Sequence, residues 1–137
     1  MEKVFVDTDI VLDLLSARPP HHKYAAILFS HADQGKIKIF ISSLVFANLN
    51  YILSKQLSAN QSRKLLVKLK TLVTVLPLND KIIALALESD FNDFEDAIQY
   101  HVARENNINT LLTRNLRDFK KSQIVILTAQ QFLKSID

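Results

Sequence analysis

Three carboxylates lie at positions where a hydrophobic core would place none. Asp7 ends an apolar stretch over residues 3–7 that is typical of a buried strand, and Asp118 follows a second apolar run over residues 108–113. Asp96 lies on the helix predicted to precede that second run. A carboxylate at the end of a buried strand is costly to desolvate without a partner or a metal ion. Carboxylates brought together also repel one another unless a cation lies between them, so these residues predict a cation site.

The helix that carries Asp96 offers a simpler explanation for its other acids. Asn92 is predicted to cap this helix, and negative charge at Asp93 and Glu95 is favoured by the unpaired N–H groups of a first turn. Asp93 and Asp96 are three residues apart and share a strip beside the apolar stripe of the helix. Asp96 is therefore expected to be half-buried. The apolar stripe comprises Phe94, Ala97, Ile98, His101 and Val102.

Strand and helix patterns alternate along the whole chain. The predicted strands cover residues 3–7, 37–41, 73–76, 108–113 and 124–127. This alternation predicts a three-layer α/β/α domain whose parallel sheet of about five strands carries helices on both faces. In such sheets ligands bind beyond the carboxyl ends of the strands. We therefore expect Asp7, Asp96 and Asp118 to converge at one edge of the sheet.

Other polar residues on the predicted helices are expected to have structural roles. Asp9 or Thr8 caps the first helix, and Asp13 falls on its solvated side. Asn48 lies among hydrophobic neighbours on a helix that begins near Ser43. It is either a buried amide that ties two elements together or a weak ligand or substrate contact, and the pattern favours neither.

Composition limits the possible classes of protein. With 137 residues, 48% of them hydrophobic, the chain is predicted to form one domain over residues 1–137. It has no cysteine, which excludes disulfides and thiolate metal sites, and its single glycine excludes a glycine-rich phosphate loop. No stretch approaches the roughly 18 apolar residues of a membrane helix, so no membrane partner is expected and a cytoplasmic location is the default.

Charge is distributed unevenly along the chain. The net charge is only +3, yet five acids lie within residues 88–96, so the rest of the surface is more basic than the total suggests. A helix predicted to begin after Ser58 carries a basic face. This face is a candidate for RNA contact only if it lies next to the predicted group of carboxylates. It comprises Arg63, Lys64, Lys68 and Lys70.

A cluster of carboxylates alone favours a hard cation. Mg²⁺ and Mn²⁺ keep several waters and need only a few protein carboxylates. The spacing of the four histidines does not suggest a zinc site.

Four stretches resemble the PIN-domain ribonucleases, and within them the VapC-like toxins of bacterial toxin–antitoxin pairs. They are VFVDTDIVLDLL, ISSLVFANLNYIL, DFEDAIQYHVA and LLTRNLRDF, and the resemblance covers essentially the whole chain. It implies that Asp7, Asp96 and Asp118 are the acids of the family, with Asp93 as a nearby additional metal ligand. It also implies hydrolysis of RNA phosphodiesters with one or two Mg²⁺ or Mn²⁺ ions, a homodimer, and an antitoxin partner that blocks the pocket.

The resemblance also assigns supporting residues and shows one departure. Thr113 and Asn115 occupy the polar loop of the family, and Arg114 between them is a substrate-binding candidate. PIN nucleases commonly place Glu at the position of Asn48. The chain therefore either holds metal more weakly, uses Asp93 to compensate, or lacks activity.

Two other hypotheses remain open from the sequence. The first is a PIN-like scaffold that is weakly active or inactive and binds RNA or protein. The second is a phosphatase of the haloacid-dehalogenase type, in which Asp7 is the nucleophile and Asp9 the acid/base. That chemistry expects a hydroxyl where Val11 stands and gives Asp96 no role.

Overall fold

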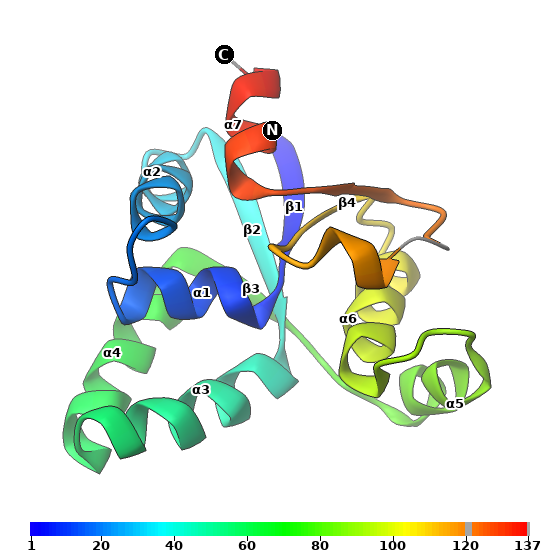
Figure 1. The fold of residues 1–137 in the computed structure, drawn as a ribbon, viewed down its shortest axis with the longest axis horizontal. Coiled ribbons are helices and arrows are strands. Elements are labelled where there is room, and N and C mark those ends of the chain that lie inside the picture. The colour runs from blue at the N-terminus through cyan, green and yellow to red at the C-terminus, as the bar shows by residue number, and fades with distance from the viewer. Residues whose placement is uncertain (120–121, 137) are drawn as a thin grey trace.

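The computed structural model describes residues 1–119 and 122–136, which form a parallel five-stranded sheet in the order β3-β2-β1-β4-β5 (Figure 1). The strands are β1 (Glu2–Val6), β2 (Ile37–Ser42), β3 (Val73–Leu76), β4 (Thr110–Leu112) and β5 (Val125–Leu127). The helices are α1 (Thr8–Leu15), α2 (His22–Asp33), α3 (Ser43–Gln56), α4 (Ala59–Leu72), α5 (Asp80–Glu88), α6 (Phe94–Glu105), α7 (Ala129–Ile136) and the 3₁₀ helix η1 (Leu116–Phe119).

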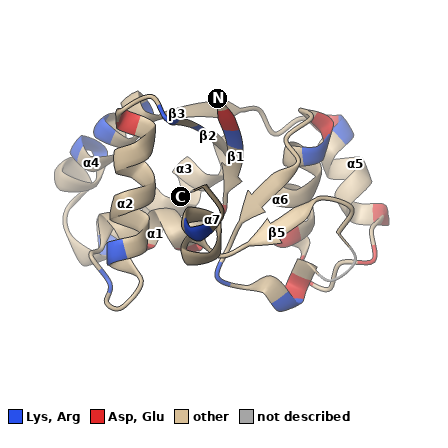
Figure 2. Ribbon diagram, turned by 90° about the horizontal axis from the view of Figure 1, so that it is seen from above, with Lys and Arg blue, Asp and Glu red and all other residues tan. Residues whose placement is uncertain are grey.

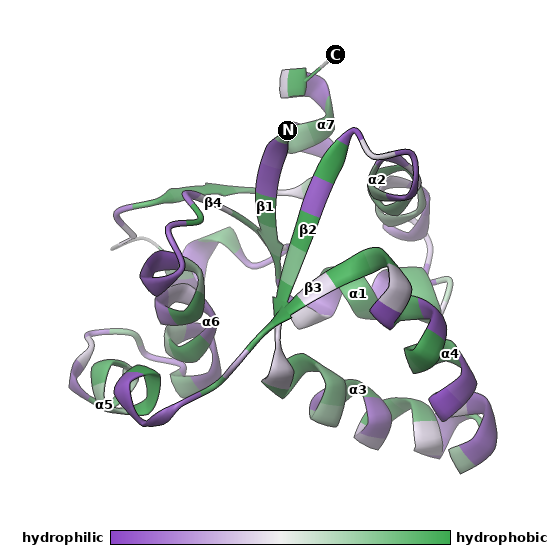
Figure 3. Ribbon diagram, turned by 180° about the vertical axis from the view of Figure 1, so that it is seen from behind, coloured by the Kyte–Doolittle hydropathy of each residue, from purple (hydrophilic) through white to green (hydrophobic). Residues whose placement is uncertain are grey.

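Helices cover both faces of this sheet, so the predicted α/β/α layering is confirmed. Alternate residues of the central strand β1 point to opposite faces: Val4 and Val6 belong to one hydrophobic cluster and Phe5 to the other. Helices α1, α2, α3, α4 and α7 contribute to the first cluster, and α5 and α6 to the second. Figure 3 shows β2 and β3 mainly in hydrophobic colours, as expected for strands buried between two layers.

The predicted caps of two helices are wrong. Asp7 caps α1, because its Oδ1 accepts a hydrogen bond of 2.8 Å from the Thr8 N–H. Asp93 caps α6 by accepting a bond of 3.0 Å from the Asp96 N–H, a role predicted for Asn92. Only one residue separates β1 from α1, so the acid at the strand end is also the cap. Two helix N-termini are therefore held by acids of the predicted site.

A buried glutamine joins three elements beneath that site. The Ser42 hydroxyl donates to Gln99 Oε1 at 2.9 Å, and Gln99 Nε2 donates to Thr8 Oγ1 at 3.4 Å. Gln99 is fully buried, whereas Phe94 of the predicted apolar stripe is 47% exposed and His101 is half-buried. The buried face of α6 thus differs from the predicted stripe, because a paired amide occupies part of it.

The basic face of α4 does not flank the acids. Figure 2 shows its Lys and Arg residues at the opposite end of the molecule from α5 and α6. The condition for an RNA contact at this face is therefore not met. Within residues 1–119 and 122–136, no helix combines the length and apolar composition that crossing a membrane requires.

We expect Gln99→Ala to lower the free energy of unfolding by about 2 kcal/mol, because the buried Ser42 hydroxyl and Thr8 lose their partner. Gln123→Ala is the matched control, since the Gln123 side chain is exposed. Urea denaturation followed by circular dichroism measures both variants. Equal free energies of unfolding for the two would contradict a structural role for the buried amide.

Candidate active site

Asp7 forms the buried floor of the candidate site. It directly follows the central strand, and its backbone N–H continues the ladder by donating to the Leu112 carbonyl at 2.9 Å. The Thr113 hydroxyl donates to Asp7 Oδ2 at 2.9 Å. Burial, followed by the charge of Asp9, raises the pKa of Asp7 to about 7, although the bonds from Thr113 and Thr8 oppose the shift. Burial and the neighbouring charge of Asp9 thus disfavour the charged form of the Asp7 carboxyl.

Asp96 and Asp118 lie beside it. Asp96 is half-buried, as the sequence predicts. Burial raises the pKa of Asp96 to about 8, together with the charges of Asp7 and Asp93 and a hydrogen bond and charge from Asp118. The structure thus brings Asp7, Asp96 and Asp118 together beyond the carboxyl ends of β1 and β4.

The loop after β4 fixes the position of Asp118. Asn115 donates its side-chain Nδ2 to Asp118 Oδ2, and its backbone N–H bonds to Thr113 Oγ1 at 3.0 Å. The short helix η1 carries Asp118 and is anchored by the buried Phe119. Thr113 and Asn115, both predicted as supporting residues, therefore hold Asp7 and Asp118 respectively.

Asp9 belongs to the same group of acids, although the sequence predicts a helix cap and gives Asp9 a chemical role only in the phosphatase hypothesis. Its Oδ2 accepts a bond of 3.1 Å from the Arg114 backbone N–H and lies 3.4 Å from Thr113 Oγ1. Burial raises the pKa of Asp9, and the Arg114 N–H and charge oppose that shift. The remaining oxygen, Oδ1, is buried without a hydrogen-bond partner among the described residues. The spacing of Asp9, two residues after Asp7, is the signal that could have identified it.

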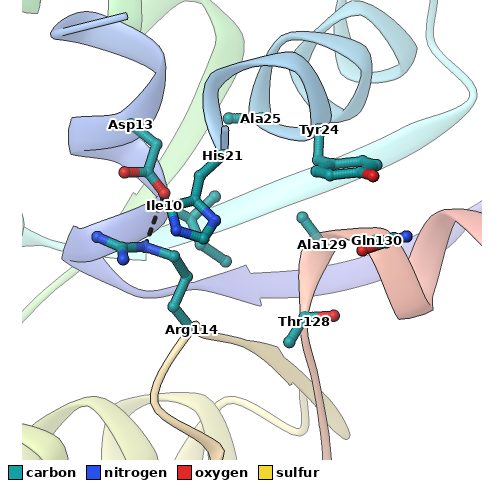
Figure 4. A pocket seen from close by; sticks show the side chains of 9 residues that line it. All are labelled: Ile10, Asp13, His21, Tyr24, Ala25, Arg114, Thr128, Ala129 and Gln130. Atoms are coloured by element: carbon teal, nitrogen blue, oxygen red, sulfur yellow. Dashed lines mark ion pairs between the residues drawn. The ribbon is translucent and has the colours of Figure 1, made fainter. Parts of the chain in front are cut away.

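Asp13 is buried and paired, so the prediction of a solvated residue is wrong. Its carboxylate lies 2.8 Å from Arg114 Nε and 2.9 Å from Arg18 Nη2, and it is 1% exposed. Figure 4 shows the Asp13–Arg114 ion pair at one side of a pocket that His21 and Tyr24 also line. Asp13 therefore fixes the guanidinium of Arg114 beside the acids.

Two residues on facing helices complete the surroundings of the site. Asn48 of α3 is half-buried, and its Nδ2 donates to Glu95 Oε1 of α6 at 3.0 Å. Its amide thus ties two elements together, one of the two roles considered from the sequence. Burial and the charge of Asp93 raise the pKa of Glu95, and the bond from Asn48 opposes the shift. Asp93 itself is exposed and caps α6.

The acids fit a hydrated divalent cation in chemistry and in charge. Every side chain of the group that could bind a metal does so through oxygen, the ligand type that Mg²⁺ and Mn²⁺ prefer. Burial is the largest cause of the raised pKa values of Asp7 and Asp96, and the charges of neighbouring acids add to it, so a bound cation would favour the charged forms of both carboxyls. Among residues 1–119 and 122–136, no three acidic or histidine side chains are close enough to form a ready-made coordination shell. An ion here would therefore keep part of its water shell.

The family model described as PIN domain matches residues 3–117. The chain belongs to the PIN-domain family. Ribonuclease VapC1 of Aquifex aeolicus (strain VF5) is 29% identical to it over 139 residues, which cover 96% of this chain and 93% of that protein. With this assignment, the haloacid-dehalogenase hypothesis loses its basis.

Solved structures agree with this fold. Mycobacterium tuberculosis VapC20, a Sarcin-Ricin loop cleaving toxin, superposes with a TM-score of 0.69 at 21% identity, covering 89% of this chain and 96% of that one. VapBC2 from Rickettsia felis, bound to a DNA fragment from its promoter, gives 0.64 at 22% identity, with coverages of 91% and 96%. These likenesses show that the PIN fold extends over nearly the whole chain.

The stability of the metal-free PIN domain is expected to fall as pH rises from about 4 to about 8. The folded pKa of Asp96, about 8, exceeds its ordinary 3.8, so ionising this group costs more in the folded than in the unfolded state. Asp96→Asn removes that cost. We expect the free energy of unfolding of the variant to equal that of the parent near pH 4. Above pH 8 it should be higher than that of the parent by about 1 kcal/mol, a value that already allows for solvent screening.

Thermal and urea melts across this pH range, with a chelator present, measure the difference. Asp33→Asn is the control, because Asp33 is an exposed acid on α2. A parallel pH dependence for parent and Asp96→Asn would show that folding does not raise the pKa of Asp96.

Proposed function

We propose that this PIN domain is a metal-dependent endoribonuclease and the toxin of a toxin–antitoxin pair. The observation that carries the proposal is the group of carboxylates beyond the carboxyl ends of β1 and β4, where burial and the charges of neighbouring acids raise the pKa values of Asp7 and Asp96. The likeness to a protein named Ribonuclease VapC1 over almost the full length of both chains supports the same activity.

Contacts within the protein position two of the proposed ligands, Asp7 and Asp96. Asp7, Asp96 and Asp118 would hold Mg²⁺ or Mn²⁺, with Asp93 as a further carboxylate at the rim. When bound, the ion supplies a nucleophilic water for hydrolysis of the RNA phosphodiester. Thr113 orients Asp7 through its hydroxyl. The capping bond between Asp93 and the Asp96 N–H fixes the start of α6, and with it the position of Asp96.

The loop after β4 offers the substrate contacts. Arg114 carries a positive charge that the buried Asp13 holds in place. A guanidinium can contact phosphate oxygens with several N–H donors, so Arg114 would bind a phosphate of the RNA next to the acids. Asn115, the next residue of the same loop, and Asn48 of α3 would contact the same RNA strand.

Two protein partners are part of the proposal. Several solved neighbours are described as VapBC complexes, which supports an antitoxin that covers the acids. Exposed apolar side chains on α3 and α4 would provide a surface for the homodimer that the resemblance implies. They include Tyr51 at 65% and Val67 at 67% exposure.

One observation favours the alternative of a weakly active or inactive scaffold. Asn48 stands where PIN nucleases commonly have Glu, and it donates to Glu95 instead of offering a carboxylate. An inactive scaffold would bind RNA or the antitoxin without cleaving RNA.

Metal binding and cleavage measured on the same variants test the proposal. At 100 times its Kd, Mn²⁺ should stabilise the parent by about 2.7 kcal/mol, because the ion binds only the folded state. Asp96→Asn and Asp118→Asn should lose most of this stabilisation and all RNA cleavage, while Asp33→Asn should keep both. If Mn²⁺ stabilises the parent but the parent does not cleave RNA, the scaffold is favoured. If neither Mn²⁺ nor Mg²⁺ changes the stability of the parent, the metal site is refuted.

A further inference from the structure

A cavity of about 170 Å³ lies beside the Asp13–Arg114 ion pair, between α1, the start of α2, the start of α7 and the loop after β4 (Figure 4). Arg114 connects this cavity to the group of acids, because its backbone N–H donates to Asp9 and its side chain lines the cavity. The proposed metal ligands are not among the residues that line it. The metal site therefore leaves this neighbouring cavity without a role.

Aromatic rings and apolar side chains form much of the lining. Ile10 and Ala25 supply an apolar base, and each is only 1% exposed. The rings of His21 and Tyr24 are half-buried and line the same cavity (Figure 4). Flat rings beside an apolar base are the surroundings in which proteins stack the unpaired bases of single-stranded RNA.

The start of α7 supplies hydrogen-bonding groups on another side of the cavity (Figure 4). Thr128 Oγ1 accepts a bond of 3.1 Å from the Gln131 N–H, so the hydrogen of its own hydroxyl can be donated to a ligand. The exposed amide of Gln130 offers both a donor and an acceptor. These groups can bond to the polar edge of a base, whereas an apolar ligand would use none of them.

The charge beside the cavity is positive. The guanidinium groups of Arg114 and Arg18 share the single carboxylate of Asp13, so these three side chains together carry a net positive charge. Lys23 adds a further positive charge, since its Nζ lies 5.0 Å from the centre of the Tyr24 ring. A nucleotide matches both features, because its phosphate can contact a guanidinium while its base enters the cavity.

A second cavity with aromatic residues, beside Phe91 and Tyr100, is less suited to RNA. Two acids, Glu88 and Asp90, and one arginine, Arg104, line it. The charge of its lining is therefore net negative and repels a phosphate. The cavity beside Arg114 is the one whose charge complements a nucleotide.

We propose that the cavity beside Arg114 binds one base of the RNA substrate, from the nucleotide whose phosphate Arg114 contacts. This inference rests on the proposed function and adds a site that reads a base outside the metal centre. The rings of Tyr24 and His21 pack against the base, and Thr128 and Gln130 bond to its edge. A base can enter the cavity only where it is unpaired, so the substrate is single-stranded at this nucleotide.

Two substitutions at Tyr24 test the stacking. Both are made together with Asp96→Asn, which the proposed function expects to abolish cleavage, so that binding alone is measured. Tyr24→Leu should weaken the binding of a fluorescent single-stranded RNA of mixed sequence by about tenfold in an anisotropy titration. Tyr24→Phe is the matched control, because it keeps the ring and should bind RNA as tightly as the protein with Tyr24. Equal RNA affinities for Tyr24→Leu and Tyr24→Phe would overturn the inference.

The salt dependence of binding separates stacking from a purely structural role. Tyr24 also packs against the hydrophobic core, so a displaced Arg114 is the structural explanation for weaker binding by Tyr24→Leu. Loss of the Arg114–phosphate contact would reduce the slope of log affinity against log salt concentration by about one. Loss of stacking lowers the affinity by the same factor at every salt concentration. A reduced slope for Tyr24→Leu would therefore overturn the stacking role.

Photochemical crosslinking locates the base directly. Single-stranded RNA in which 5-iodouridine replaces uridine should crosslink to Tyr24 or His21 when it is irradiated with the Asp96→Asn protein. Mass spectrometry of the crosslinked peptides identifies the residue. Crosslinks confined to α4 or to Phe91 would overturn the inference, because the RNA would then bind elsewhere on the protein.

Metal binding and cleavage measured without the Asp96→Asn change distinguish this inference from the proposed function. Tyr24→Leu should bind Mn²⁺ like the parent, because Tyr24 is not one of the proposed ligands. If the parent cleaves RNA but Tyr24→Leu and Tyr24→Phe bind RNA equally, the nuclease stands and the base site is refuted. If the parent binds RNA through Tyr24 without cleaving it, the base site stands and the nuclease is refuted. A parent that binds no RNA overturns both.

Discussion

The crowding of carboxylates at one edge of the sheet is the constraint on which the rest of the structure depends. Burial and mutual repulsion raise the pKa of Asp7 to about 7 and that of Asp96 to about 8. Part of this cost is offset by the N-termini of α1 and α6, since Thr8 and Asp96 donate backbone N–H groups to acids of the cluster. The fold thus directs two helix N-termini at its most negative region.

The sequence was sufficient to predict the layers and the acids at the strand ends. Strands buried on both faces appear as short apolar runs, and helices separate them, so their alternation specifies a parallel sheet. Asp7 and Asp118 follow such runs, which is why the sheet edge could be predicted. The cap of α1 could not be predicted, because the single residue between β1 and α1 serves as both strand end and cap.

The residues that sequence analysis missed are those whose partners are distant in the chain. Asp9 accepts from Arg114, 105 positions later, and Glu95 accepts from Asn48, 47 positions earlier. Asp13 appeared solvated because a helical pattern shows only which side of a helix is polar. The burial of Gln99 was missed because its hydrogen-bond partner, Ser42, lies on another element. Local periodicity carries no information about such pairs.

The distribution of arginine partners separates two kinds of acid in and around the candidate active site. Arg114 lies against Asp13 through its guanidinium and bonds to Asp9 through its backbone N–H, and Arg18 also pairs with Asp13. Among the residues that the structure describes, no Lys or Arg forms an ion pair with Asp7, Asp96 or Asp118. A buried carboxylate that is paired with an arginine is already neutralised and does not need a metal ion. The acids without an arginine partner lie where a bound cation would lower the electrostatic energy most, whereas the charge of Arg114 is paired with Asp13.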